Sequence, residues 1–170
     1  MISAPAKFTS PFDIETFAKA LRSDVSPTDK SVRVCIGTGC AAKGSRRLYE
    51  LFCEAAQKLK TQNSKLKTFQ VEVKCVGCHG FCQRGPIVVV EPGEIFYQRV
   101  EEPDVAEIFR ETVLGARVVQ RLLYEDPGTG KRAERANEIP FYSVQHRIVL
   151  ADNGKIDPTK ITDYIAQGGY

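Results

Sequence analysis

The chain has 170 residues, which is enough for one globular domain with extensions. Hydrophobic residues make up 42% of the sequence and charged residues 26%, as in ordinary globular domains, and no apolar run approaches the roughly 18 residues of a membrane span. A formal net charge of +3, without a block of like charges, argues against a nucleic-acid-binding protein. The N-terminus lacks a basic region followed by an apolar core, so we expect a cytoplasmic protein without direct membrane insertion.

Four segments of the first half carry clear periodicity. In residues 1–30, apolar residues recur at helical spacing before a Ser-Pro pair, which predicts a short amphipathic helix. Residues 31–36 alternate and are rich in β-branched residues, which predicts a strand that leads into a glycine-bearing loop. Residues 43–60 place their apolar side chains on one helical face, and residues 68–75 alternate like a half-buried strand.

The next segments predict a hairpin and a helix. Two apolar runs, at residues 87–90 and 95–100, are separated by a short turn that contains proline and glycine, as in an antiparallel hairpin. Acidic residues and Pro103 then open a helix that ends at Gly115. With a parallel first pair joined by a crossover helix, the order of elements over residues 31–115 predicts a thioredoxin-like α/β sandwich.

The pattern changes after residue 115. Residues 116–145 are charged and lack periodicity, which predicts a linker. The Gly-Thr-Gly-Lys sequence at 128–131 lacks the full spacing and the preceding strand of a phosphate-binding loop. In residues 146–170 we expect a strand at 147–150 and a helix from about Pro158. This segment is either part of a longer polypeptide or a tail that docks on a partner.

Two cysteine-bearing loops each follow a predicted strand, so we expect them to meet at one edge of the sheet. The first loop places Cys35 and Cys40 in a C-x4-C pair, and the second places Cys78 and Cys82 in a C-x3-C pair. Four thiolates suit a tetrahedral zinc ion or a 2Fe–2S cluster. Zinc sites usually use tighter C-x2-C pairs, and glycines in both loops would let backbone N–H groups approach the sulfurs, so we favour iron and sulfur.

The other cysteines and the histidines are weaker candidates. Cys75 continues the apolar face of its strand and Cys53 lies mid-helix beside Phe52, so we expect both to be core residues. His79 lies between two candidate ligands, and we interpret it as a solvent-exposed residue. A Rieske-like site would need a second histidine on the same iron, and His146 lies in another segment.

Two other classes of function use the same residues. A structural zinc module would hold its metal with the same four thiolates but would be colourless and redox-silent. A dithiol-disulfide oxidoreductase would suit the predicted fold, but it normally needs a C-x-x-C pair at a helix N-terminus. The only C-x-x-C pair here, Cys75 and Cys78, precedes a loop and a strand, so we rank this alternative third.

The C-x4-C pair, followed by the sequence GCHGFCQRGP at residues 77–86, resembles the thioredoxin-like 2Fe–2S ferredoxins, including the small complex I subunit of that type. The segment from Leu122 onward, with IPFY, RIVL and DYIAQGGY, looks like the entry into the NADH-binding flavoprotein subunit of complex I. Together these segments are similar to the N-terminal part of the diaphorase β-subunits of NAD-linked or electron-bifurcating FeFe hydrogenases and related formate dehydrogenases.

This resemblance implies a domain organisation and a function. It implies an N-terminal helical extension at 1–30, a thioredoxin-like 2Fe–2S domain at 31–115, an extended linker at 116–145, and the start of an FMN- and NADH-binding domain at 146–170. It implies electron transfer within an NAD(P)H-dependent oxidoreductase, alongside other redox subunits and in some cases as a homodimer. The cluster ligands that it implies are Cys35, Cys40, Cys78 and Cys82.

The remaining cofactors of such a subunit are expected elsewhere. In these proteins FMN, the NAD(H) site and a 4Fe–4S cluster lie beyond the position of Tyr170. We therefore assign electron relay, and no hydride chemistry, to the residues of this sequence.

Overall fold

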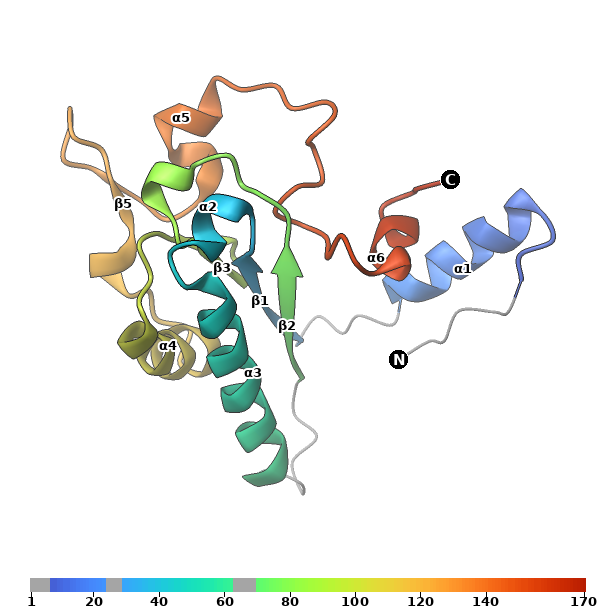
Figure 1. Cartoon of the computed structure of the whole chain (residues 1–170), viewed down its shortest axis with the longest axis horizontal. Coiled ribbons are helices and arrows are strands. Elements are labelled where there is room, and N and C mark those ends of the chain that lie inside the picture. Colours follow the sequence, from blue (N-terminus) through green and yellow to red (C-terminus); the bar gives the residue numbers. More distant parts are fainter. Residues whose placement is uncertain (1–6, 24–28, 63–69) are drawn as a thin grey trace.

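The structure, a computed structural model, describes residues 7–23, 29–62 and 70–170. Its centre is a mixed sheet of four strands in the order β2-β1-β3-β4 (Figure 1). β1 pairs in parallel with β2 and antiparallel with β3, and β3 forms an antiparallel hairpin with β4. The predicted parallel pair and hairpin are therefore confirmed. The strands are β1 (Lys30–Cys35), β2 (Val71–Val76), β3 (Val88–Glu91) and β4 (Ile95–Tyr97).

The strand that the sequence predicts at residues 68–75 is only partly covered by the structure. Its first two residues lie outside the described residues, and the described part, β2, ends one residue later than predicted.

A crossover helix, α3 (Ser45–Gln62), connects the parallel strands β1 and β2. Its residues Leu48, Phe52 and Ala56 are buried at every fourth position, so one face of the helix packs on the sheet. A short helix, α2 (Thr38–Ala41), precedes it. The long helix therefore begins five residues after Cys40.

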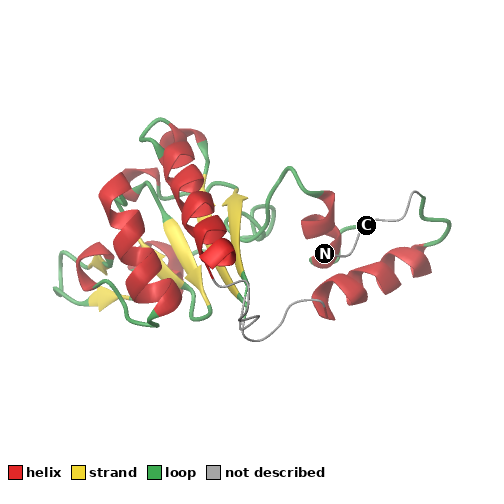
Figure 2. Cartoon of the chain, turned by 90° about the horizontal axis from the view of Figure 1, so that it is seen from below, coloured by secondary structure: helices red, strands yellow, loops and turns green. Residues whose placement is uncertain are grey.

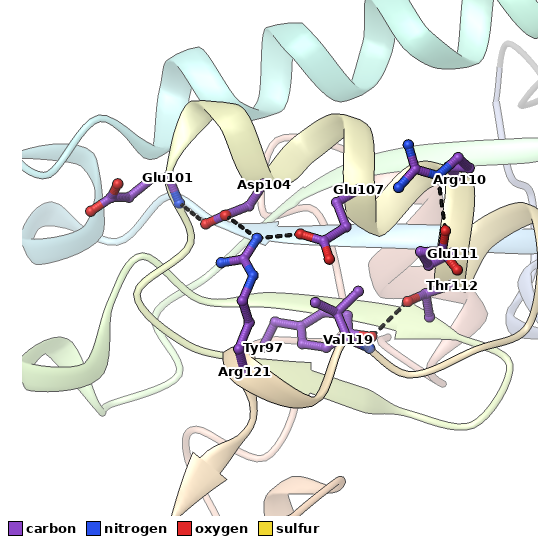
Figure 3. A network of polar contacts seen from close by, with 9 residues as sticks. All are labelled: Tyr97, Glu101, Asp104, Glu107, Arg110, Glu111, Thr112, Val119 and Arg121. Atoms are coloured by element: carbon purple, nitrogen blue, oxygen red, sulfur yellow. Dashed lines mark hydrogen bonds and ion pairs between the residues drawn. The ribbon is translucent and has the colours of Figure 1, made fainter.

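The second helix of this layer, α4 (Glu102–Ile108), lies beside α3 (Figure 1). The backbone N–H of Glu101 donates to the Asp104 carboxylate at 2.7 Å, which satisfies one unpaired donor at the helix start (Figure 3). The chain continues as a π-helical turn, η2 (Phe109–Leu114), and reaches Gly115. The predicted helix and its end are confirmed.

Both faces of the sheet are covered, which explains why residues 87–90 form one continuous apolar run. Val88 and Val90 face the helices α3 and α4, while Ile87 and Val89 lie in a second hydrophobic layer. Alternate residues of a strand point to opposite faces, so a strand between two layers is apolar throughout. The second layer consists of Cys35, Cys40, Ile87, Val89, Phe96, Tyr124, Ala133 and Ile139.

The prediction of a linker at residues 116–145 is wrong, because this segment folds against the second face of the sheet. Backbone N–H groups of Phe96 and Gln98 donate to the carbonyls of Glu134 (2.7 Å) and Leu122 (3.0 Å), so the segment also bonds to the edge strand β4. Its elements are η3 (Gln120–Leu122), β5 (Tyr124–Glu125), β6 (Arg132–Ala133), η4 (Ala136–Glu138) and α5 (Pro140–Ser143).

The first and last helices pack on each other, to one side of the sheet (Figure 2). Phe17 and Ala18 of α1 (Pro11–Ser23) contact Ile165 of α6 (Ile161–Ala166), and the Arg22 Nε atom donates to the carbonyl of Ala166 at 2.7 Å. Both helices were expected, and α6 begins three residues later than predicted.

The strand predicted at residues 147–150 is wrong. These residues form bends and turns, and Ile148 and Val149 are 77% and 93% exposed. A strand needs a neighbour for its backbone hydrogen bonds, and none of the described strands pairs with this segment.

Within the part of the chain that the structure describes, no helix has the length and apolar character needed to cross a membrane.

Candidate metal centre

The four candidate ligands lie at one end of the sheet, on the two loops that follow β1 and β2. Cys35 is the last residue of β1 and is paired with Val76, the last residue of β2. Cys40 lies in α2, Cys78 lies two residues beyond β2, and Cys82 opens the turn η1 (Cys82–Arg84). Because parallel strands end at the same edge of a sheet, both loops begin side by side.

Glycines allow the two loops to interlock. A Cβ atom on Gly37 would lie 2.7 Å from Cβ of Cys78, and one on Gly39 would lie 3.0 Å from Cβ of Cys82. A Cβ atom on Gly85 would lie 2.5 Å from Sγ of Cys40. Gly37 and Gly85 leave no room for a side chain and Gly39 leaves very little, so the three glycines let each cysteine loop close against the other.

The thiols lie as two linked pairs. The sulfurs of Cys78 and Cys82 are 3.8 Å apart, and the thiols of Cys40 and Cys78 both contribute to lowering the pKa of Cys35. Among the described residues, no three His, Cys, Asp or Glu side chains lie close enough together to hold a metal ion as they stand. A donor set of four thiols in two pairs, surrounded by glycine, fits a group with two iron ions.

Backbone N–H groups point at the sulfurs. Gly80 N–H donates to Sγ of Cys78 at 3.3 Å, and His79 and Gly37 donate to the sulfur of Cys35. The N–H of Ile87 donates to Cys40. Such donors stabilise negatively charged sulfur, as thiolate ligands require.

The pKa values of Cys35 and Cys40 are shifted in opposite directions. The hydrogen bond from Cys40 lowers the pKa of Cys35 to about 6, against the effect of burial and with the help of N–H donors. The same hydrogen bond and burial raise the pKa of Cys40.

The site is closed on one side and open on the other. Cys35 and Cys40 are buried, Cys78 is half-buried and Cys82 is exposed. The Lys43 ammonium lies on the exposed side, where it donates to the carbonyl of Cys82 at 3.0 Å. Cys82 is therefore the most accessible of the four candidate ligands.

The interpretation of His79 as solvent-exposed is wrong. Its side chain is only 8% exposed, its ring lies edge-on to Phe96, and burial lowers its pKa to about 4. The ring is covered by Gly154, where a Cβ atom would lie 2.6 Å from Cε1 of the histidine. This contact joins residues far apart in the sequence, so no local pattern indicates it.

Cys53 and Cys75 are half-buried rather than core residues. β2 is an edge strand whose interior positions are partly open, which explains the exposure of Cys75. Cys53 is hydrogen-bonded to Tyr49, and this bond is the main reason that the pKa of Tyr49 is raised to about 12.

Two residues near the site were missed by sequence reasoning. Tyr142 packs against the layer that contains Cys35 and Cys40, and the Arg147 guanidinium donates to the carbonyl of His79 at 2.7 Å. Tyr142 lies within the segment predicted as a linker and Arg147 lies just after it, and an aromatic residue close to a proline is too common a pattern to indicate such a role.

Residues 14–113 match the family model of the thioredoxin-like [2Fe-2S] ferredoxins. The chain belongs to this family. Its membership confirms the predicted thioredoxin-like fold, the 2Fe–2S cofactor and a ferredoxin-type electron-transfer function, and it favours iron and sulfur over the zinc and dithiol alternatives.

Several ferredoxins of known sequence or structure are similar to the chain. A 2Fe–2S ferredoxin of Aquifex aeolicus is 34% identical over 84 residues, which cover 49% of this chain and 71% of that protein. A 2Fe–2S ferredoxin of Clostridium pasteurianum is 36% identical over 83 residues, covering 49% and 76%. The crystal structure of the wild-type thioredoxin-like [2Fe-2S] ferredoxin from Aquifex aeolicus aligns with a TM-score of 0.48 and 29% identity, over 58% of this chain and 98% of that one.

The family match ends at residue 113. The segment that covers the second face of the sheet, with Tyr142 and Arg147, lies beyond the ferredoxin match.

Proposed function

We propose that Cys35, Cys40, Cys78 and Cys82 bind the 2Fe–2S cluster of this ferredoxin. The observation that carries this proposal is the interlocking of the two cysteine loops through Gly37, which brings thiols from distant parts of the sequence together. Cys53 and Cys75 lie on α3 and β2, outside these loops, and have no ligand role in the proposal.

The chain's residues then perform three tasks. The thiolates hold the iron, the N–H donors around them stabilise negative charge on sulfur, and the buried layer behind Cys35 keeps water from one side. When bound, a 2Fe–2S cluster accepts and releases one electron at a time. The exposed position of Cys82 supports electron exchange on that side of the site.

We further propose that this ferredoxin serves an NAD(P)H-linked, FMN-containing oxidoreductase of the hydrogenase, formate dehydrogenase or complex I type. The support is the sequence resemblance from Leu122 onward, with residues 146–170 as the start of a flavin domain. Partners would be other redox subunits, with a homodimer as one arrangement, and FMN, NAD(H) and a 4Fe–4S cluster would be bound outside these residues. A cytoplasmic location fits six cysteines that are free thiols.

Single serine substitutions test the ligand set. Each of C35S, C40S, C78S and C82S should lose or perturb the native cluster, because a serine oxygen is a poor substitute for a soft thiolate. The measurements are iron and acid-labile sulfide content after anaerobic purification, the visible spectrum, and EPR after dithionite reduction. C53S and C75S are matched controls and should keep about two irons per chain. A full iron content and an unchanged EPR spectrum in all four site variants would refute the ligand assignment.

The role in a larger oxidoreductase needs a separate test. The protein is isolated under mild conditions from the cells that produce it, and FMN content and cluster reduction by NADH or NADPH are measured. The proposal predicts stoichiometric FMN and a cluster that NAD(P)H reduces without added mediators. An isolated complex without flavin, whose cluster is inert to both nucleotides, would contradict this role and leave the ligand assignment intact.

A further inference from the structure

The hydroxyl group of Tyr142 is enclosed beside the candidate cluster site and lacks a hydrogen-bond partner within the described part of the chain. Tyr142 lies in α5, and its side chain packs on the layer that contains Cys35 and Cys40. Burial of an unpaired hydroxyl costs free energy, because the group loses its hydrogen bonds to water. Such a group beside a cofactor site is a candidate donor to that cofactor.

Neighbouring rings hold the Tyr142 side chain in place. Phe81, Phe96 and Phe141 lie edge-on to it, with ring centroids 5.7, 5.8 and 5.0 Å away. Phe81 belongs to the second cysteine loop and Phe96 to β4, so the phenol is clamped between the loop and the sheet. Edge-to-face aromatic contacts fix ring orientation as well as position.

Arg147 completes this clamp. Its guanidinium carbon lies 5.0 Å from the centroid of the Tyr142 ring, and its Nη2 atom donates to the carbonyl of His79 at 2.7 Å. The same nitrogen lies 2.9 Å from the place of a Cβ atom on Gly80, the residue whose N–H donates to Cys78. Arg147 thus connects the Tyr142 ring directly to the second cysteine loop.

Burial and the charges of three cysteines act together on the phenol of Tyr142. Burial is the main cause of the raised pKa of Tyr142, and the charges of Cys35, Cys78 and Cys40 add to it, while Arg147 opposes them. The phenol therefore keeps its proton and offers one O–H donor. Cys35 and Cys40 belong to the buried layer on which the Tyr142 ring packs, and thiolate sulfur accepts hydrogen bonds.

We propose that the Tyr142 hydroxyl donates a hydrogen bond to a sulfur of the bound 2Fe–2S cluster and raises its reduction potential, with Arg147 as the residue that positions the ring. This inference rests on the proposed ligand set. Reduction adds one negative charge to the cluster and its thiolates, so a donor to sulfur stabilises the reduced state more than the oxidised state. The proposed donor, Tyr142, lies in the segment after residue 113, where the match to the ferredoxin family ends.

The test compares Y142F with the wild-type chain and with Y124F. Tyr124 is a matched control because it lies in the same layer and also has an arginine over its ring, with Arg84 5.1 Å from the centroid. The hydroxyl of Tyr124 is not among the buried atoms without a partner in the described residues. Iron and sulfide content, the midpoint potential from an EPR redox titration, and exchangeable proton couplings by ENDOR in H2O and D2O are measured.

Y142F should retain its cluster, lose one exchangeable proton coupling and shift to a lower midpoint potential. At a fixed potential near the midpoint, the ratio of reduced to oxidised cluster should fall about fivefold, the equilibrium equivalent of one ordinary hydrogen bond. Y124F should match the wild type. An unchanged midpoint potential and unchanged proton couplings in Y142F would overturn the inference, while the cluster in the wild type would still support the ligand set.

A second replacement keeps the test decisive if Y142F does not load its cluster. Fluorination of Tyr142 at one ortho carbon strengthens the donor and preserves the ring, so the midpoint potential should rise. A potential equal to that of the wild type would overturn the inference. Absence of a 2Fe–2S cluster from the wild-type chain would instead refute the proposed function, and this inference with it.

Discussion

A Cβ atom on Gly85 would lie 2.5 Å from Sγ of Cys40. Gly85 follows the second cysteine loop and Cys40 belongs to the first, so this contact sets how closely the two loops approach. The backbone of Gly85 is extended, with φ −72° and ψ 161°, which any residue can adopt. Glycine is needed here for space alone.

We therefore expect G85A to disrupt the metal centre. The added methyl group would displace a buried sulfur, and overpacking of a closed interior costs about 1–3 kcal/mol. Iron content and thermal unfolding are the measurements, and both should fall. G128A is the control, since a Cβ atom on Gly128 has only the Asp126 carboxylate oxygen at 3.3 Å, in an exposed turn. Full iron loading and an unchanged melting temperature in G85A would show that the loops are not in close contact.

The segment after residue 115 should stabilise the protein as a structural cover. Ile139 is fully buried in the layer that contains Cys35 and Cys40, so I139A should cost about 2–4 kcal/mol and shorten the lifetime of the cluster in air. The measurements are denaturant unfolding and the decay of visible absorption under oxygen. V144A, at a residue 84% exposed, should change neither. Equal behaviour of the two variants would favour a loosely attached linker.

Arg121 forms ion pairs with two acidic residues of α4, Asp104 and Glu107 (Figure 3). It bonds to Asp104 at 2.6 Å and also to Glu107, but only Asp104 is buried and also accepts the N–H of Glu101. D104A should therefore cost about 1–2 kcal/mol through the lost helix cap, whereas E107A should cost less than about 1 kcal/mol, as exposed ion pairs do. Urea unfolding measures both, and a larger loss in E107A would contradict this ranking.

The hydroxyl of Tyr97 connects the edge strand to the end of the helix layer. It lies 2.6 Å from Oγ1 of Thr112 and accepts the N–H of Val119 at 3.0 Å, in a fully buried position (Figure 3). Y97F should cost about 1–3 kcal/mol, because the variant leaves buried polar groups unpaired. The measurement is the free energy of unfolding in urea. Y164F, at a residue 45% exposed, is the control and should be neutral.

Local patterns predicted the sheet and its cysteine loops well, because each depends on neighbours in sequence. Alternation in β1 and β2 and the short turn before Ile95 each leave a clear signal. Once β1 and β2 are read as parallel, the loops after them must meet at one edge. Placement of Cys35 and Cys78 at the same end of the sheet follows from that geometry alone.

The missed features depend on contacts between distant residues. Tyr124, Ala133 and Ile139 cover the second face with irregular spacing, so residues 116–145 show no period although each of the three is buried. The burial of His79 depends on Gly154, and the clamp on Tyr142 depends on Arg147. The opposite error occurred at residues 147–150, where an apolar run resembles a strand but has no neighbouring strand among those described.

The parallel pairing of β1 with β2 also imposes an order of events in time. Cys35 and Cys78 are separated by the whole crossover helix, and they become neighbours only after that helix has docked and the two strands have paired. Closing so long a stretch of chain is slow compared with forming a turn or a helix. A site with all four thiols side by side therefore exists only in a chain whose strands β1 and β2 have paired.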